Sequence, residues 1–236
     1  MMARAMAGPA LRLGGAFLLG SVPFSRYVAH LVAGTDLRRV GSGTVSASGV
    51  YQVAGTQPFL LVCLLDAGKG AAAMRVVRRS GTGTVAAAAA LVVVGHAWSP
   101  LLRGAGGRGV LPAIGVLTVA QPTGAALLIS GIAVGRARGD SAPGCFVAQA
   151  LLTPFLALTG GRRGALVGAA TAVPMLTKRL LGNQGFRRHT SAATYLTRAV
   201  YDREHRQRRP SVMTEAATQR RAGRDGLALS HHGRSS

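Results

Sequence analysis

The sequence predicts an all-α fold: a polytopic membrane helical bundle of about seven transmembrane helices, with five to seven as the range. Three observations lead to this fold class. Hydrophobic residues make up 48% of the 236 residues. Charged residues make up only 15%, against about 25% in an ordinary soluble domain. The apolar runs also lack a recurring polar face, and segments 91–95 and 127–134 are apolar all round, which is typical of helices buried in lipid or protein.

About seven apolar runs account for the predicted helices in order. They lie near residues 11–32, 57–77, 82–98, 109–121, 123–138, 143–159 and 164–182. Several are shorter than the roughly 20 residues that cross a bilayer, so buried soluble helices are the alternative for the short runs. The first run follows Arg4 and Arg12 as a signal peptide would. No small-x-small cleavage site ends it, so we expect it to be retained.

Small residues recur inside these runs. Gly131 with Gly135, and Gly164 with Gly168, form G-x-x-x-G patterns. In an apolar helix this spacing lets a second helix approach closely. We therefore expect tight helix contacts at both places.

Residues 185–236 are rich in arginine and poor in apolar residues. We therefore divide the chain into a membrane-integral domain, 1–184, and a basic, flexible tail, 185–236, with a short helix near 192–201. Because positive charge favours the cytoplasmic side, we expect this multi-pass protein of the cell membrane to hold its polar loops and tail in the cytoplasm. The tail would touch anionic lipid. A nucleic-acid arm is the less favoured alternative, so no nucleic acid is expected as a partner.

Two polar, glycine-rich segments interrupt the apolar runs. The first, 34–44, holds Arg38 and the sequence Gly41-Ser42-Gly43. The second, 104–110, holds Gly106-Gly107-Arg108-Gly109. Arginine matches phosphate geometry, and glycine frees backbone N–H groups to face an anion, so both segments suit phosphate binding. A flexible connection between helices is the alternative for the first segment.

Two apolar runs contain polar side chains. Asp66 and Lys69 are three residues apart, so they share one face of a helix. An unpaired charge in the hydrocarbon costs a few kcal/mol, so we expect these two to pair or to face a polar cavity. His96 ends the third run as either a proton carrier or a hydrogen-bonded interfacial residue. We expect Arg26, Arg38, Asp66, Lys69 and the 104–109 loop to approach one cavity, and Arg179 to reach the interface at the end of the last helix.

Signatures of several enzyme classes are missing. The chain has no G-x-S-x-G motif and no P-loop. Its two cysteines, Cys63 and Cys145, have no metal-binding spacing with a histidine. We therefore expect neither a metal nor an organic cofactor.

Several motifs occur together in a characteristic order. They are Gly20-Ser21-Val22-Pro23-Phe24-Ser25, Gly34-Thr35-Asp36-Leu37-Arg38, Gly41-Ser42-Gly43, Asp66-Ala67-Gly68-Lys69-Gly70, Gly95-His96 and Gly106-Gly107-Arg108-Gly109-Val110. The set resembles the bacterial membrane-integral acyl-phosphate:glycerol-3-phosphate acyltransferases over roughly residues 14–182.

The resemblance implies a function and a set of site residues. Such an enzyme moves an acyl group from acyl phosphate to glycerol 3-phosphate and yields lysophosphatidic acid for phospholipid biosynthesis. Its partners are membrane lipid and these two small substrates. The expected catalytic residues are Ser42, Arg38, Lys69 and His96. The expected substrate-binding residues are Gly41, Gly43, Gly106, Gly107, Arg108, Gly109, Ser141 and Asp66.

The chain also departs from the family pattern. Thr44 and Gly49 stand where the first loop of the family has asparagine, and Arg108 stands where the glycine loop has lysine. Val173 and Leu176 take the places of a histidine and an asparagine in the last helix. The chain therefore resembles a diverged member of this family. The alternative function is that of a non-catalytic membrane homologue that binds lipid phosphate or a partner protein.

Overall fold

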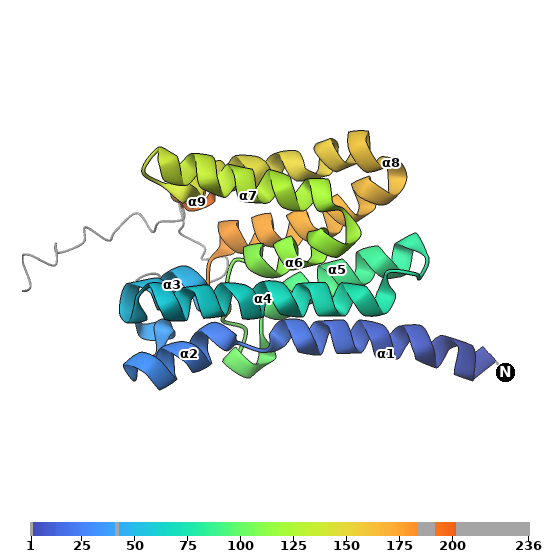
Figure 1. The fold of residues 1–236 in the computed structure, drawn as a ribbon, viewed down its shortest axis with the longest axis horizontal. Coiled ribbons are helices and arrows are strands. Elements are labelled where there is room, and N and C mark those ends of the chain that lie inside the picture. Colours follow the sequence, from blue (N-terminus) through green and yellow to red (C-terminus); the bar gives the residue numbers. More distant parts are fainter. Residues whose placement is uncertain (1, 41–42, 184–191, 202–236) are drawn as a thin grey trace, which may run out of the picture. The chain divides into compact units, whose positions relative to one another are not determined.

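The structure is a computed structural model that describes residues 2–40, 43–183 and 192–201. Throughout these ranges the chain forms helices and no strands, so the all-α prediction is confirmed (Figure 1). The helices are α1 (Met2–Ser21), α2 (Phe24–Ala33), α3 (Ala47–Ala54), α4 (Thr56–Val77), α5 (Thr82–Ala97), α6 (Val110–Ala120), α7 (Pro122–Ala137), α8 (Ser141–Leu181) and α9 (Ala192–Tyr201). All of them belong to one compact unit, residues 1–204.

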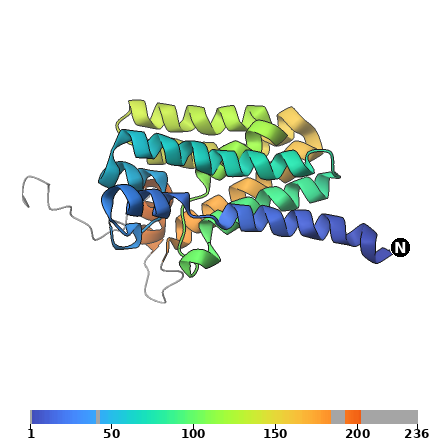
Figure 2. The same ribbon diagram turned by 60° about the horizontal axis from the view of Figure 1, so that its bottom comes forward.

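The first predicted helix is divided into α1 and α2. Proline has no backbone N–H and disfavours helical geometry in the residue before it, so the helix breaks at Val22 and Pro23 (Figures 1 and 2). The break exposes the Val22 carbonyl, which accepts a hydrogen bond from Lys69 Nζ at 2.9 Å. A single unbroken helix over 11–32 was therefore a wrong prediction, and the interruption supplies a group to the site.

Helix α3 lies between the predicted runs 11–32 and 57–77 and was not predicted. Its first turn is stabilised by Ser46, whose hydroxyl accepts from the Gly49 N–H at 3.4 Å. Serine is a preferred N-cap residue because its oxygen satisfies one of the free N–H groups of the first turn. The short helix directs Ser46 and Ser48 toward the cavity described below.

Helix α8 contains the last two predicted helices, 143–159 and 164–182. Gly161 separates them with φ 57° and ψ −148°, a conformation that glycine adopts without the steric cost of a Cβ atom. The chain turns back there, and Gly164 and Gly168 lie against residues 152–156 of the first arm. Gly131 and Gly135 of α7 similarly lie against residues 140–148 of α8. Both G-x-x-x-G patterns thus mark close helix contacts, as predicted.

Three stretches of the described chain are long and apolar enough to cross a membrane. They are Gly8–Ala33, Thr82–Leu102 and Ser141–Leu181, and the shorter apolar helices are Val110–Ala120 and Pro122–Ala137. A membrane-integral helical bundle is therefore confirmed, while the number of crossings stays a prediction. Helix α5 lies at its centre and contacts α1, α4, α6 and α8 through a buried face of alanine and valine.

The contact between α4 and α6 depends on glycine, and this generates a stability prediction. A Cβ atom on Gly70 would collide with the backbone oxygen of Pro112, whereas a Cβ atom on Gly68 would meet nothing within 4 Å. Gly70→Ala should therefore lower the free energy of unfolding by about 1–3 kcal/mol through overpacking. Gly68→Ala on the same helix should leave it unchanged or raise it by up to about 1 kcal/mol.

Thermal unfolding of both variants in detergent measures the difference. Gly70→Ala should unfold several degrees below the parent chain, and Gly68→Ala should not. Equal unfolding temperatures for the two variants would show that α4 and α6 are not packed as the structure has them.

Candidate active site

A buried ion pair joins Asp66 and Lys69 on α4. The Lys69 Nζ atom lies 2.8 Å from Asp66 Oδ1, and both side chains are 1% exposed. Three residues separate them along one helix, so they meet on the same face. The predicted pairing of these two charges is confirmed. It removes the cost of holding either charge alone inside an apolar bundle.

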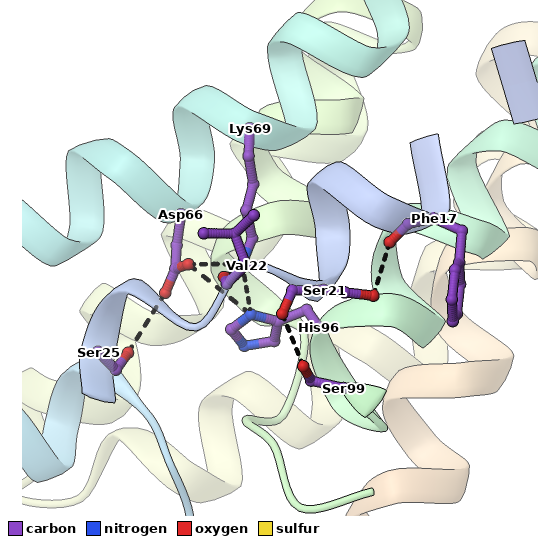
Figure 3. Close-up of polar contacts among 8 residues, drawn as sticks. All are labelled: Phe17, Ser21, Val22, Ser25, Asp66, Lys69, His96 and Ser99. Carbon is purple, nitrogen blue, oxygen red and sulfur yellow. Dashed lines mark hydrogen bonds and ion pairs between the residues drawn. The ribbon is translucent and has the colours of Figure 1, made fainter. Parts of the chain in front are cut away.

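Lys69 connects this pair to two other helices. Its Nζ donates to the Val22 carbonyl at 2.9 Å and lies 2.9 Å from His96 Nδ1 (Figure 3). An ammonium group has three donors and no acceptor. Lys69 thus has an ion pair with Asp66 and hydrogen bonds with the Val22 carbonyl and His96. The His96 Nδ1 atom therefore acts as an acceptor, and the neutral imidazole carries its proton on Nε2.

Ser25 completes the cluster from α2. Its hydroxyl donates to Asp66 Oδ2 at 3.5 Å, and the side chain is buried. Figure 3 shows Ser25 and Lys69 on different sides of the Asp66 carboxylate. Sequence analysis missed the role of Ser25. The available signal is its spacing: Ser25 shares the buried face of α2 with Val28 and Ala29, at positions i, i+3 and i+4.

The second glycine loop lies directly on His96. The Gly107 N–H donates to the His96 carbonyl at 3.3 Å. A Cβ atom on Gly107 would collide with His96 Nε2, and one on Gly106 would collide with the His96 carbonyl oxygen. Glycine is therefore required here because the loop backbone approaches the imidazole more closely than a side chain allows.

The end of α8 holds the same loop from its other side. Arg108 Nη1 donates to the carbonyls of Lys178 and Arg179 at 3.2 and 3.3 Å, and these carbonyls belong to the helix end, where intrahelical partners run out. Lys178 Nζ lies 3.5 Å from the Gly104 carbonyl and 5.1 Å from the centre of the Trp98 ring. Sequence analysis did not assign Lys178 to the site.

Arg179 does not reach the interface, so that prediction was wrong. The residue is 3% exposed. Its Nη1 donates to the Ala142 carbonyl at 3.0 Å and to the Ala199 carbonyl at 2.6 Å, and its guanidinium lies 5.9 Å from the Phe146 ring centre. The two backbone acceptors and the aromatic ring hold the charge inside, between the first turn of α8 and α9.

A cavity of about 250 Å³ adjoins these groups. Its polar lining consists of Ser46, Ser48, Asp66, His96, Arg108, Ser141 and Arg179, and its apolar lining includes Phe59, Cys63, Val110, Leu111 and Ile132. Because Asp66 is already paired with Lys69, the two arginines leave the cavity with net positive charge. It can hold an anionic group at one wall and an apolar chain at another. No three His, Cys, Asp or Glu side chains of the described residues lie together as a metal site.

The first glycine loop contributes less to the cavity than expected. Arg26 and Arg38 are not among the lining residues. Arg38 Nη2 lies 2.6 Å from Asp36 Oδ2, and its side chain is 36% exposed. The hydrogen bond from Arg38 lowers the pKa of Asp36 to about 2. Gly41 and Ser42 lie outside the described residues.

Asn183 joins the two glycine loops. Its Nδ2 donates to the Gly43 carbonyl at 2.7 Å, and its Oδ1 accepts from the Gly106 N–H at 3.3 Å. Sequence analysis missed this residue, since an asparagine just after a helix is an ordinary helix-ending residue. The structure therefore brings Gly43, Gly106, Gly107, Arg108, Gly109, Ser141, Asp66, Lys69 and His96 to one region, while Arg38 pairs with Asp36 beside it.

The buried ion pair gives a second prediction. Asp66→Ala leaves Lys69 buried without its anion and should lower the free energy of unfolding by about 3–5 kcal/mol. The double variant Asp66→Ala/Lys69→Met should recover much of the loss, because apolar side chains can replace a buried pair at little cost. Chemical or thermal denaturation of the purified chain measures both.

Asp36→Ala is the matched control, since it removes the acid of an exposed pair. Exposed ion pairs contribute little to stability, so its unfolding temperature should stay close to that of the parent. A loss as large for Asp36→Ala as for Asp66→Ala would contradict the buried pair as a source of stability.

Comparisons with known proteins agree with this geometry. A family profile described as glycerol-3-phosphate acyltransferase matches residues 10–190. The chain is 36% identical over 156 residues to a glycerol-3-phosphate acyltransferase of Roseobacter denitrificans, which covers 64% of this chain and 78% of the relative. It is 31% identical over 209 residues to the enzyme of that name from Gluconobacter oxydans, covering 86% of this chain and 93% of the relative.

Two solved structures share the fold. One is a crystal structure of PlsY, an integral membrane glycerol 3-phosphate acyltransferase, in its glycerol 3-phosphate form, with a TM-score of 0.66 and 25% identity over 76% of this chain and 94% of that one. The other is the lysophosphatidic acid form, with a TM-score of 0.60 and 23% identity over 80% of this chain and 98% of that one.

Proposed function

Because this chain belongs to the glycerol-3-phosphate acyltransferase family, we propose that it transfers an acyl group to glycerol 3-phosphate in the membrane and releases lysophosphatidic acid. The observation that carries the proposal is the composition of the cavity. Its lining includes Arg108, Arg179, His96 and Ser141 together with Phe59, Leu111 and Ile132. One cavity thus offers both cationic donors for phosphate and apolar side chains for an acyl chain.

We propose acyl phosphate as the acyl donor. Its carbonyl is already activated, so the reaction needs no protein nucleophile. The glycerol 3-phosphate hydroxyl attacks the acyl carbonyl carbon, the bond between that carbon and the phosphate oxygen breaks, and inorganic phosphate leaves with the hydroxyl proton. The protein has to hold two phosphates in reach of one another and stabilise charge on the carbonyl oxygen and the departing phosphate.

The proposed roles follow from where the groups lie. Arg108 binds phosphate through its guanidinium, and the Ser141 hydroxyl, which also lines the cavity, donates a hydrogen bond. The His96 Nε2–H points at the 106–109 loop, because Lys69 occupies Nδ1. Lys69 positions His96, and Asp66 lines the cavity while paired with Lys69. Ser42 and Gly41 would add donors from the first loop.

We propose the cytoplasmic side of the cell membrane for the site. Arg108, from the glycine-rich segment 104–110, lines the cavity, and the polar loops are expected on the cytoplasmic side. The sequence 185–236 is rich in arginine, and positive charge favours the cytoplasm.

A second candidate function is a non-catalytic homologue that binds lipid phosphate. The observation in its favour is the loss of the family's polar residues in the last helix. Val173 is 60% exposed, and neither Val173 nor Leu176 lines the cavity. The cavity would then hold an anionic headgroup without turnover.

Arg108 separates these functions and gives a third prediction. Arg108→Ala should lower turnover by at least about tenfold, since a lost charged contact contributes roughly 1.5–3 kcal/mol. Arg108→Lys keeps the charge found in the family, so its activity should survive. The assay supplies acyl phosphate and labelled glycerol 3-phosphate to purified protein and measures labelled lysophosphatidic acid.

Arg75→Ala is the matched control, because Arg75 is exposed in the last turn of α4, away from the cavity. It should leave turnover unchanged. Arg108 also donates to the end of α8, so each rate is expressed per folded molecule. No turnover by the parent chain, together with binding of glycerol 3-phosphate, would favour the non-catalytic homologue.

A further inference from the structure

We infer that Asn183 is a positioning residue that holds the two glycine loops together, so that groups from both loops address the phosphates of one reaction. The inference rests on the proposed function for its consequence in catalysis. The link between the two loops does not depend on the proposed function, because it is inferred from two hydrogen bonds of Asn183.

The link uses both ends of one amide. The Asn183 Nδ2 donates to the Gly43 carbonyl at 2.7 Å, and its Oδ1 accepts from the Gly106 N–H at 3.3 Å. Gly43 and Gly106 are far apart in the sequence and belong to different connections between helices. The Asn183 side chain thus has one hydrogen bond to each glycine loop. An amide suits this task because it carries a donor and an acceptor on one rigid plane.

The position of Asn183 is set by the end of α8. The helix ends at Leu181, and the Gly182 N–H donates to the Lys178 carbonyl at 2.9 Å. Gly182 has φ 62° and ψ −151°, a conformation open to glycine and strained for other residues. Because α8 ends at this turn, the helix does not extend past the two glycine loops. The side chain of the next residue, Asn183, lies between them.

Other contacts around the loops join different elements. Lys178 and Arg108 connect the second loop to α8. The two loops themselves come close, since a Cβ atom on Gly107 would lie 2.9 Å from the Val45 carbonyl oxygen. Close approach of two backbones without a hydrogen bond fixes their spacing poorly. The amide of Asn183 supplies the bonds.

Spacing between the loops matters because the reaction has two phosphate-bearing substrates. A misplacement of about 1 Å can reduce a rate by about 100-fold when reactants must be aligned. Asn183 brings a side-chain amide to the first loop from the end of α8, a distant part of the chain.

Two measurements on the full-length purified chain test the inference. The first is amide hydrogen exchange of the peptide that contains Gly106, which needs no turnover. Asn183→Ala removes the acceptor of the Gly106 N–H, so exchange should become about tenfold faster. Asn183→Asp keeps an oxygen acceptor for the Gly106 N–H. It replaces the Nδ2 donor, which faces the Gly43 carbonyl, with a carboxylate oxygen. Exchange at Gly106 should then stay slow.

The second measurement is steady-state kinetics with acyl phosphate and glycerol 3-phosphate. Asn183→Ala and Asn183→Asp should both lower kcat/KM by about tenfold, the loss expected for one or two neutral hydrogen bonds. The thermal unfolding temperature of Asn183→Asp should stay near the parent value. Gln57→Ala, which changes an exposed amide at the start of α4, is the matched control and should alter neither measurement.

The outcomes are separable. Unchanged exchange at Gly106 in Asn183→Ala overturns the link. Faster exchange with unchanged kcat/KM overturns the positioning role. A parent chain without turnover overturns the proposed function, while exchange still decides on the link. If Asn183→Ala cannot be purified in folded form, Asn183→Asp alone tests the positioning role. Slow exchange at Gly106 together with a reduced kcat/KM would then support the inference.

Discussion

The ion pair of the Lys69 ammonium group with Asp66 and its hydrogen bonds with Val22 and His96 are the constraint on which the rest of the site depends. They join α4 to the break between α1 and α2 and to the end of α5. A buried ammonium without partners is costly in a bundle of this composition. One arrangement therefore includes the Val22 carbonyl at the Pro23 break, the Asp66 carboxylate and the His96 ring. Each of these groups offers the Lys69 ammonium an oxygen or nitrogen acceptor.

Much of the fold could be predicted because apolar length and small-residue spacing are local properties. The segments 57–77 and 82–98 correspond closely to α4 and α5, and Gly164 and Gly168 lie at a close contact. The break at Pro23 and the short helix α3 were missed. Hydrophobicity alone does not show where a proline interrupts a run, nor that Ser46 begins a helix in a polar stretch.

The site was predictable where charge in an apolar run demanded a partner, as for Asp66 and Lys69. It was not predictable where neutral side chains or backbone atoms provide the contact. The sequence around Ser25, Asn183 and Val22 does not show which groups their side chains or carbonyls contact. Their roles come from the tertiary packing of α2, α8 and the glycine loops. Arg179 illustrates the same limit, since its burial depends on two carbonyls from separate parts of the chain.

The turn at Gly161 has a consequence for how the protein is made. It returns the second arm of α8 to the place where the first arm starts, so Ser141 and Arg179 line one cavity although 38 residues separate them (179 − 141). Chains are synthesised from the N-terminus, and earlier segments can fold first. A nascent chain that stops before the second arm would have the buried lysine and its partners in place. It would lack one wall of the cavity until the final helix entered the membrane and closed it.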